Sequence, residues 1–369
     1  MQHLLEKIID KFQIQSKFIS YQELNSGHIN DTYLIKTQHK PHYVLQRING
    51  NVFRKTEELI TNKVLVSNFL QGKLSQLTQD EIFKKVLCFV QAKDTTFFYK
   101  DDKGNYWNTT VLIENSITYH KTPNAQIAFE GGKATGSFLE QTKEFDASEL
   151  TNILPDFHSV SKRYLQLKEA LKTTSKDKIS NVKEHLDFIE NHIDEMKTID
   201  VAIENNQLEL RLTHSDTKIS NILFSESNKA ICLIDTDTVM SGVLHFDYGD
   251  AIRTICNTAD EDSKELETID FNLEYFKSYS EGFLSELKNI PKHEYDILPL
   301  SIKMMPFIMG IRFLTDYLNG NIYYKTNYNA HNLDRAIAQF TLMKKINEKS
   351  PQINDFFSNY KKLKKSFVS

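Results

Sequence analysis

The residues best suited to chemistry lie in one segment, LTHSDTKISNILFSESNKAICLIDTDTV. Asp216, Lys218 and Asn221 come first, and Asp235 follows nineteen residues after Asp216. A tight loop with this spacing can aim one carboxylate at a hydroxyl group and one amide at a metal ion. Carboxylate and amide oxygens suit Mg²⁺, which takes few protein ligands and leaves room for phosphate oxygens. The spacing therefore predicts a proton acceptor and a metal pair that act on one phosphate.

The two apolar runs of this segment must position its polar residues. NILF and AICLID are strand-like runs, and the turn residues SESNK join them. If the runs pair as strands, Asp235 at the end of the second returns beside Asn221. The alternative is a solvated polar loop between helices with aspartates as caps, but caps require neither the asparagine nor the lysine. We favour the paired strands, which is the catalytic-loop and metal-loop layout of kinase-like phosphotransferases.

The elements around this segment fall into a β-rich part and a helical part. Residues 17 to about 113 are expected to form a five-stranded antiparallel sheet with one helix inserted at 56–71. We therefore predict an α+β, two-lobed, protein-kinase-like fold, with a β-rich lobe at 1–115 and a mainly helical lobe at 116–369. Helices in the second lobe are predicted at 124–141, 147–157, 182–196, 271–287, 299–318 and 331–347. Pro299 is expected to begin one of these helices and Pro306 to kink it.

Composition limits the class of protein. The 369 residues are 40% apolar and 25% charged with a net charge of −4, which is ordinary for a soluble chain and gives no basic field for nucleic acid. The N-terminus is typical of a short amphipathic helix rather than a signal peptide, and the run MMPFIMGI is too short to span a bilayer. Three widely spaced cysteines fit reduced thiols. We expect a cytoplasmic monomer with neither nucleic acid nor membrane as partner.

Several stretches resemble a known superfamily. HSDTKISNILF and LIDTDT resemble the aminoglycoside phosphotransferase and choline kinase superfamily. One branch of it, the N-acetylhexosamine 1-kinases, is similar in further stretches between about residues 24 and 326: NSGHINDTYLIKT, YVLQRINGNVF, YWNTTVLIENSITY, VMSGVLHFDYGDAIRT and GIRFLTDYLNGNIYYKT. The resemblance implies a two-lobed kinase fold that uses ATP and Mg²⁺. It also implies a sugar substrate, an N-acetylhexosamine phosphorylated on its anomeric hydroxyl.

The resemblance assigns roles in the catalytic segment. Asp216 would accept or orient the proton of the acceptor hydroxyl, and Lys218 would neutralise charge on the transferred phosphoryl group. Asn221 and Asp235 would hold Mg²⁺ against the nucleotide phosphates. Asp237 would either help with the metal or cap the loop, and the sequence leaves both open. His214 is interpreted as a residue that fixes the loop.

Nucleotide contacts are expected from the first lobe. Arg47 in YVLQR occupies the place where related kinases put a phosphate-binding lysine, and Glu57 or Glu58 is its expected partner. The alternative for Arg47 is an ordinary charge on an edge strand. Gly27 in NSGHIN would belong to a loop that covers the phosphates. The hinge to the adenine would be LIENS, with cofactor contacts from the backbone at Glu114 and Asn115.

Sugar contacts are expected from both lobes. His28, Asn30 and Asp31 would serve the nucleotide or the sugar, although Asn30 and Asp31 could equally be turn residues. By resemblance, Arg312 and Tyr323 would bind the sugar, since a neutral polar sugar needs forked donors and an aromatic edge. The alternative is a surface ion pair between Arg312 and Asp316, which are four residues apart on one helix.

The segment HFDYGDAIR carries charges whose role is structural in our interpretation. Asp247, Asp250 and Arg253 lie close together in it. We expect internal ion pairs that brace the catalytic loop rather than contacts with the sugar.

Other functions remain open at the level of sequence. The acceptor could be an amino alcohol, a homoserine-like metabolite or an aminoglycoside, and a cationic acceptor would favour an acidic pocket. A protein kinase is disfavoured because no long activation loop separates Asp235 from VMSGVLHFDYGD. A non-catalytic nucleotide-binding regulator is disfavoured because Asp216, Lys218, Asn221 and Asp235 are all present.

Overall fold

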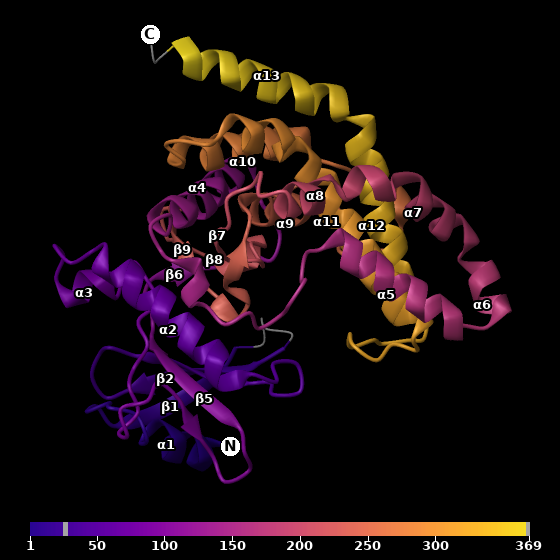
Figure 1. The fold of residues 1–369 in the computed structure, drawn as a ribbon. Helices are drawn as coiled ribbons and strands as arrows, with labels where there is room; N and C mark the ends of the chain where they lie inside the picture. The colour runs from indigo at the N-terminus through magenta and orange to yellow at the C-terminus, as the bar shows by residue number, and fades with distance from the viewer. Residues whose placement is uncertain (25–28, 367–369) are drawn as a thin grey trace.

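The smaller lobe is built on an antiparallel sheet. The computed structural model describes residues 1–24 and 29–366, and Figure 1 shows this chain in two lobes. Five strands pair in the order β1-β2-β3-β5-β4, which confirms the predicted sheet. Their bounds are β1 (Phe18–Glu23), β2 (Asp31–Thr37), β3 (Tyr43–Ile48), β4 (Tyr99–Lys100) and β5 (Tyr106–Val111).

Helices cover opposite faces of this sheet. The helices of the smaller lobe are α1 (Gln2–Ile9), α2 (Thr56–Gly72) and α3 (Gln79–Ile82). On one face, α1 shares a core with Leu45 and Trp107. On the other face, α2 shares a core with Ile48 of β3. Because the side chains of a strand alternate between its two faces, neighbouring residues of β3 point toward different helices.

The larger lobe is mainly helical, as predicted. Its helices are α4 (Ala125–Gln141), α5 (Val160–Thr173), α6 (Lys176–Asn181), α7 (Lys183–Met196), α8 (Thr198–Glu204), α9 (Leu244–Ile255), α10 (Leu273–Glu286), α11 (Lys292–Leu318), α12 (His331–Glu348) and α13 (Ser350–Ser366). Figure 1 shows α4 and α10 side by side above the junction of the lobes, with α13 across the far end. The predicted two-lobed, protein-kinase-like fold is therefore confirmed.

Two small sheets in the larger lobe carry the catalytic segment. One has the order β6-β8-β9 and the other pairs β10 with β7. Their bounds are β6 (Ser116–Ile117), β7 (Arg211–Thr213), β8 (Ile222–Ser225), β9 (Ala230–Leu233) and β10 (Met240–Gly242). The predicted hairpin is confirmed, because Ile222 is opposite Leu233 in an antiparallel pair.

Glycines let α4 and α10 approach each other closely. A Cβ atom on Gly132 of α4 would lie 2.0 Å from the backbone oxygen of Tyr279, and one on Gly282 of α10 would lie 2.1 Å from that of Phe129. Such distances exclude any side chain at these positions. The glycines of the run GGKATG therefore serve helix packing.

The helix predicted at 147–157 does not form. Only a 3₁₀ turn at Ala147–Glu149 is present. Instead, the side chain of Asn62 on α2 forms two hydrogen bonds with the backbone of Thr151. Its Nδ2 donates to the Thr151 oxygen at 2.7 Å, and its Oδ1 accepts from the Thr151 N–H at 3.0 Å. Pro155 further along lacks the N–H that a helix needs. Contacts with the other lobe therefore replace the helical bonds.

Helix α11 differs from its prediction at its start. It begins at Lys292, so Pro299 and Pro306 both lie inside it. By length and composition α11 could cross a membrane, but 67% of its most apolar stretch is buried inside the protein. We assign it as the central helix of the lobe.

The apolar run VLCFV at 86–90 joins the sheet through a single bridge. Phe89 pairs with Thr110 of β5, and no further strand pairing extends this bridge among the described residues.

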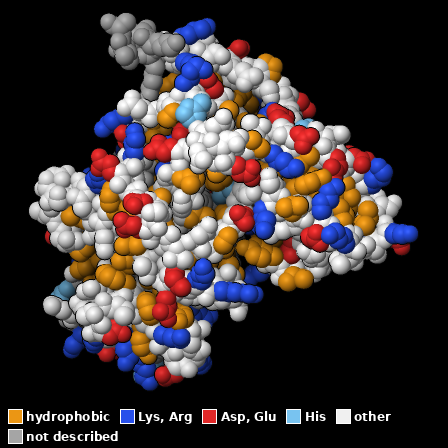
Figure 2. Space-filling model, in the orientation of Figure 1, with side chains coloured by type: hydrophobic (Ala, Val, Ile, Leu, Met, Phe, Trp, Pro, Cys, Tyr) orange, Lys and Arg blue, Asp and Glu red, His pale blue; other side chains and the backbone are white. Residues whose placement is uncertain are grey.

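On the protein surface, Figure 2 shows charged side chains of both signs scattered over the visible face.

Candidate active site

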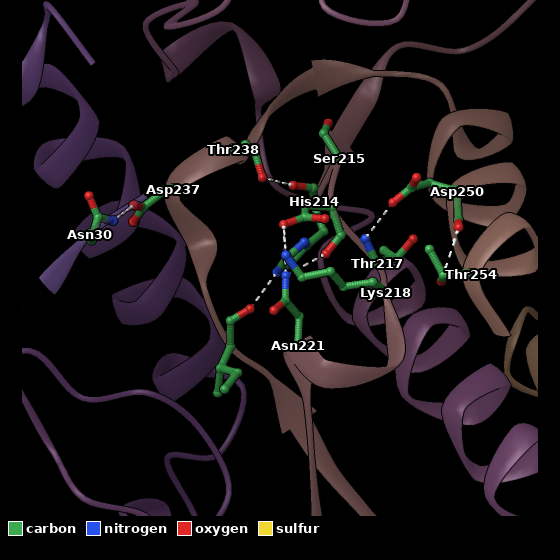
Figure 3. A network of polar contacts seen from close by, with 12 residues as sticks. Asn30, His214, Ser215, Thr217, Lys218, Asn221, Asp237, Thr238, Asp250 and Thr254 are labelled. Carbon is green, nitrogen blue, oxygen red and sulfur yellow. Dashed lines mark hydrogen bonds and ion pairs between the residues drawn. The ribbon is translucent and has the colours of Figure 1, made fainter. Parts of the chain in front are cut away.

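The catalytic loop connects β7 with β8 and converges on Asp216. The Nδ2 atom of Asn221 donates to the backbone oxygen of Asp216 at 3.0 Å and to its Oδ2 at 2.9 Å. Lys218 donates from Nζ to the same Oδ2 at 3.1 Å. Figure 3 shows Lys218 and Asn221 gathered at this loop. The three residues that the spacing singled out therefore meet around one carboxylate.

The charge of Asp216 is maintained although its side chain is only 29% exposed. Burial acts to raise its pKa, but the charge of Lys218 and the hydrogen bonds outweigh it, and the pKa lies below its ordinary value. The Asp216 carboxylate in turn raises the pKa of Lys218. The pair is therefore a carboxylate beside an ammonium group, which is suited to orient a hydroxyl and to balance phosphate charge.

Helix α9 braces the loop, as predicted. Asp247 accepts from the backbone N–H of His214 at 2.9 Å and of Ser215 at 2.7 Å. Ser215 has a φ of 64°, a left-handed conformation that needs such support. Asp250 accepts from the Thr217 N–H at 3.2 Å (Figure 3) and pairs with Arg253 at 2.9 Å. The predicted bracing role of this segment is confirmed.

His214 links the loop to the second strand of the hairpin. Its side chain is fully buried, and its Nε2 lies 2.9 Å from the backbone oxygen of Ile234, to which it donates. Ile234 also donates its N–H to the backbone oxygen of Asn221 at 2.8 Å. These bonds hold Asp235, the next residue, beside Asn221. His214 is thus a scaffold residue, as the sequence suggested.

Asp235 and Asn221 fit a divalent cation. Asp235 adopts a left-handed conformation with a φ of 61°. Burial, followed by the charges of Asp237 and Asp216, raises its pKa to about 7, and Lys63 opposes that rise. The described residues contain no cluster of three or more His, Cys, Asp or Glu able to hold a metal ion. A pair of oxygen ligands with excess negative charge is suited to Mg²⁺ that also binds phosphates.

Asp237 is held by the smaller lobe. Its carboxylate forms an ion pair with Lys63 of α2 and accepts a hydrogen bond from Asn30, which precedes β2. Figure 3 shows Asn30 and Asp237 facing each other. The sequence left open whether Asp237 helps with the metal or caps the loop. In the structure its side chain instead links the two lobes.

The predicted partner of Arg47 is wrong. Arg47 pairs with Asp31 of β2 rather than with Glu57 or Glu58, and its guanidinium lies 5.8 Å from the ring centre of Trp107. That face of the sheet is covered by α1, so strand alternation turns Arg47 away from α2. Its neighbour Gln46 points toward α2 instead and accepts from Lys63 at 2.8 Å.

The remaining nucleotide and sugar predictions in this lobe fare differently. Asp31 is engaged with Arg47 on the outer face, which argues against its predicted contact with substrate. Gly27 and His28 lie outside the described residues. Glu114 and Asn115 lie in the connection from β5 to β6, where Glu114 pairs with Lys40. Their adenine-binding role stays a prediction.

Arg312 and Asp316 do not form the surface ion pair considered above. Asp316 is 6% exposed, and its carboxylate accepts the backbone N–H groups of residues 322, 323 and 324 at 2.8–3.0 Å. Arg312 lies against rings, 4.6 Å from the ring centre of Phe157 and 5.7 Å from that of Tyr324. Tyr323 is 56% exposed, and the tyrosine ring that lies near Arg312 is that of Tyr324.

Sequence reasoning missed the residues that join Arg312 to the catalytic loop. The ring of His158 lies 4.5 Å from that of Phe157, and its Nε2 donates to the Ser215 backbone oxygen at 3.2 Å. Arg163 donates to the Phe157 oxygen at 2.9 Å. No motif marks this segment in the sequence. In addition, the predicted helix at 147–157 does not form, so the expected position of Phe157 and His158 was wrong.

Two buried histidines predict how stability depends on pH. Burial is the main cause that lowers the pKa of His158 to about 3 and that of His245 to about 4. The unfolded chain takes up protons below a pKa of about 6.5, so the free energy of unfolding falls as the pH drops through that value. At about pH 5 each histidine should lower it by about 2 kcal/mol. Calorimetry should show that His245→Asn loses less stability on acidification than wild type, and equal losses would contradict this.

Comparison with protein families points to phosphotransferases. Residues 120–282 match the sequence profile of the phosphotransferase enzyme family, APH. The matched segment contains Asp216, Asn221 and Asp235, together with the bracing helix α9. The residues that meet in the structure therefore lie within the part of the chain that matches.

Solved structures share the fold over nearly the whole chain. A spectinomycin phosphotransferase in complex with ADP and spectinomycin is 12% identical, with 94% of this chain and 97% of that chain aligned and a TM-score of 0.57. A microcompartment-associated aminopropanol kinase is 14% identical, with 94% and 98% aligned and a TM-score of 0.58. Choline kinase LicA from Streptococcus pneumoniae is 13% identical, with 94% and 99% aligned and a TM-score of 0.52. Residues 120–282 are thus similar to the phosphotransferase enzyme family, APH, and the chain as a whole shares the two-lobed fold of these kinases.

Proposed function

We propose that this phosphotransferase uses ATP and Mg²⁺ to phosphorylate the anomeric hydroxyl of an N-acetylhexosamine, N-acetylglucosamine or N-acetylgalactosamine, giving the sugar 1-phosphate. The observation that carries the choice of acceptor is Arg312. Among the described residues, no ion pair involves its guanidinium, which contacts two aromatic rings and the sulfur of Met309. A free guanidinium offers forked donors to carbonyl and hydroxyl oxygens, such as those of an acetamido sugar.

The position of Arg312 supports an acceptor site beside the catalytic loop. Contacts run from Arg312 through Phe157 and His158 to Ser215, the residue before Asp216. A hydroxyl bound on this side would therefore come within reach of the Asp216 carboxylate. The tyrosine hydroxyl of Tyr324 is buried and has no hydrogen-bond partner, so it offers one more polar group to a ligand.

The same charges argue against cationic acceptors. Arg163 also lies near, and its charge and that of Arg312 both act to lower the pKa of His158 after burial, the largest cause. An aminoglycoside, choline or amino alcohol would bring an ammonium group toward these arginines, and the repulsion would weaken binding. A cationic acceptor is the second candidate, because structures with the same fold include a spectinomycin phosphotransferase and an aminopropanol kinase.

The residues divide the work of the reaction. Mg²⁺ held by Asn221 and Asp235 would neutralise charge on the nucleotide phosphates. Asp216 orients the acceptor hydroxyl and takes its proton, while Lys218 faces the transferred phosphoryl group. Contacts across the lobes, such as Asn30 with Asp237, close the site against water, which would otherwise compete as acceptor.

We also place the reaction in the cytoplasm and expect a monomer. The three cysteines are free thiols. Burial raises the pKa of Cys88 and Cys232 to about 12, which favours the protonated thiol at neutral pH. Gel filtration with light scattering would test the monomer, and a stable dimer would contradict it.

Replacement of Arg312 should affect the acceptor and spare the nucleotide. Arg312→Met is expected to raise KM for N-acetylglucosamine by about 10- to 100-fold, because hydrogen bonds to a charged group contribute about 1.5–3 kcal/mol. KM for ATP should stay near the wild-type value. Arg312→Lys, which keeps the charge but loses the fork, should recover part of the loss. Equal effects on both substrates would reject the assignment.

An acceptor panel tests the proposed function as a whole. ATP turnover should be measured with N-acetylglucosamine, N-acetylgalactosamine, glucose and galactose, and in parallel with choline, aminopropanol and an aminoglycoside. We expect turnover of the N-acetylated sugars. Turnover restricted to the cationic acceptors would favour the second candidate. ATP binding without turnover of any acceptor would favour a regulator.

A further inference from the structure

Lys63 is a buried cation that the catalytic scheme above leaves without a task. It lies in the middle of α2, and only 4% of its surface is exposed. Its Nζ forms an ion pair with Asp237 and donates to Gln46 at 2.8 Å. A charge this deeply buried is costly unless it is paired, and it is seldom kept without a specific role.

The two partners of Lys63 come from different elements, and a third segment reaches one of them. Gln46 lies on β3 of the smaller lobe, and Asp237 lies in the 3₁₀ turn Thr236–Thr238, two residues beyond Asp235. Asn30 reaches the same carboxylate from the segment before β2. The ammonium group therefore joins the sheet, the helix and the turn that follows the metal pair.

Protein kinases join the corresponding strand and helix with a different arrangement of charge. There a lysine on the third strand pairs with a glutamate on the helix, and this pair must form before the site is active. Here the strand supplies Gln46, which is neutral, and the helix supplies the cation. The carboxylate comes from the larger lobe as Asp237.

We propose that the Lys63–Asp237 ion pair performs a comparable positioning role between different elements, so that Lys63 fixes the turn of Asp235 against α2. The inference rests on the proposed function, because it concerns the same transfer reaction. Asp237 is then committed to Lys63 and leaves the metal to Asn221 and Asp235. Arg47, on the far face of the sheet, takes no part.

The packing behind Lys63 makes this ion pair important. A cavity of 280 Å³ separates α2 from α4 and β9, with Lys63, Leu70, Phe138 and Thr236 among its lining residues. The hydroxyl of Thr236 is buried there and has no hydrogen-bond partner. Because α2 is not packed tightly against α4 at this point, the Lys63–Asp237 ion pair supplies a fixed contact between α2 and the turn Thr236–Thr238.

Single variants test the role of Lys63. Lys63→Met has a similar shape without the charge, and we expect kcat to fall by about 10²-fold, as small misplacements of reacting groups do. The Mg²⁺ concentration for half-maximal rate should rise, while KM for the acceptor stays the same. Lys63→Arg should restore part of kcat. Lys73→Met is the matched control, because Lys73 follows the last turn of the same helix and also pairs with a residue of the other lobe, Glu144. This ion pair is exposed to solvent and therefore contributes little. The variant should leave kcat and the Mg²⁺ requirement unchanged.

A double-mutant cycle separates positioning from loss of folding. Asp237→Asn should resemble Lys63→Met, and the two changes together should cost no more than one alone, since they remove one interaction. Thermal unfolding of each variant monitors folding. Additive losses in kcat, an unchanged Mg²⁺ requirement, or a larger loss for Arg47→Met than for Lys63→Met would overturn the proposal.

Binding measurements keep this test separate from the identity of the acceptor. Calorimetric titration with Mg²⁺ and a non-hydrolysable ATP analogue needs no acceptor. We expect Lys63→Met and Asp237→Asn to weaken the Mg²⁺-dependent part of binding, and Lys73→Met to leave it unchanged. If wild type phosphorylates no sugar, the proposed function fails, yet this titration still decides the role of Lys63. Binding that is unchanged in both variants would overturn it.

Discussion

Asp216→Asn is expected to lower kcat by about 10²–10⁴-fold, the range for loss of a general base. The physical reason is its position: Lys218 and Asn221 both donate to its Oδ2, and the resulting carboxylate keeps a pKa below the ordinary value. An amide of the same shape cannot accept the proton of the acceptor hydroxyl. KM for ATP should change little, because the metal pair remains. Steady-state kinetics with saturating sugar and varied ATP measure both quantities.

A surface aspartate provides the control for this prediction. Asp187 on α7 pairs with Lys183 and is well exposed, so Asp187→Asn should leave kcat unchanged. Circular dichroism and thermal unfolding should show that Asp216→Asn folds like wild type. A loss of less than 10-fold in kcat, in a folded Asp216→Asn variant, would remove Asp216 from the catalytic role.

Asp235→Ala is expected to abolish turnover at ordinary Mg²⁺ concentrations. Metal stabilisation of phosphate charge contributes several kcal/mol, so the loss should be on the order of 10³-fold or more. In the structure Asp235 is partly buried, and its pKa is raised first by that burial and then by the nearby carboxylates of Asp237 and Asp216. A bound divalent cation would offset this excess of negative charge. Asp235→Ala removes the carboxylate that would bind the cation.

A magnesium titration separates loss of the metal from loss of the fold. If Asp235 is a ligand, very high Mg²⁺ should recover part of the activity of Asp235→Asn, which keeps one oxygen, and less of that of Asp235→Ala. Asp187→Asn should titrate like wild type. Full activity of Asp235→Ala at ordinary Mg²⁺ would reject the metal assignment.

The catalytic loop could be predicted from sequence because its geometry is local. Asp216, Lys218 and Asn221 lie within six residues, and only one loop conformation is needed to bring them together. Asp235 depends on one more element, the hairpin of β8 and β9, whose apolar runs and turn residues are visible in the sequence. The bracing by Asp247 and Asp250 was likewise indicated by their density in one short helix.

The smaller lobe exposed the limit of that reasoning at one position. Pairing Arg47 with Glu57 or Glu58 of α2 is an error of a single residue on a strand, because Gln46 is the residue that faces α2. Because strand side chains alternate, such an error places the side chain on the opposite face of the sheet. Arg47 consequently meets Asp31 and Trp107, while Gln46 meets Lys63.

Other parts of the site depend on contacts between distant segments. Lys63 and Asp237 are 174 residues apart and belong to different lobes, so no spacing rule joins them. His158 and Phe157 approach the catalytic loop only because Asn62 of α2 holds the backbone of Thr151 and a helix is not formed there. Such tertiary hydrogen bonds outweigh local propensity, and they become visible only in the folded structure.

The position of the phosphate on the product tests the central claim most directly. Purified protein should be incubated with ATP, Mg²⁺ and N-acetylglucosamine or N-acetylgalactosamine, and the product examined by phosphorus NMR. The account predicts a phosphate coupled to the anomeric proton, which identifies the sugar 1-phosphate, and no such product with Asp216→Asn. A 6-phosphate, or no phosphorylated product with either sugar while another acceptor is turned over, would contradict it.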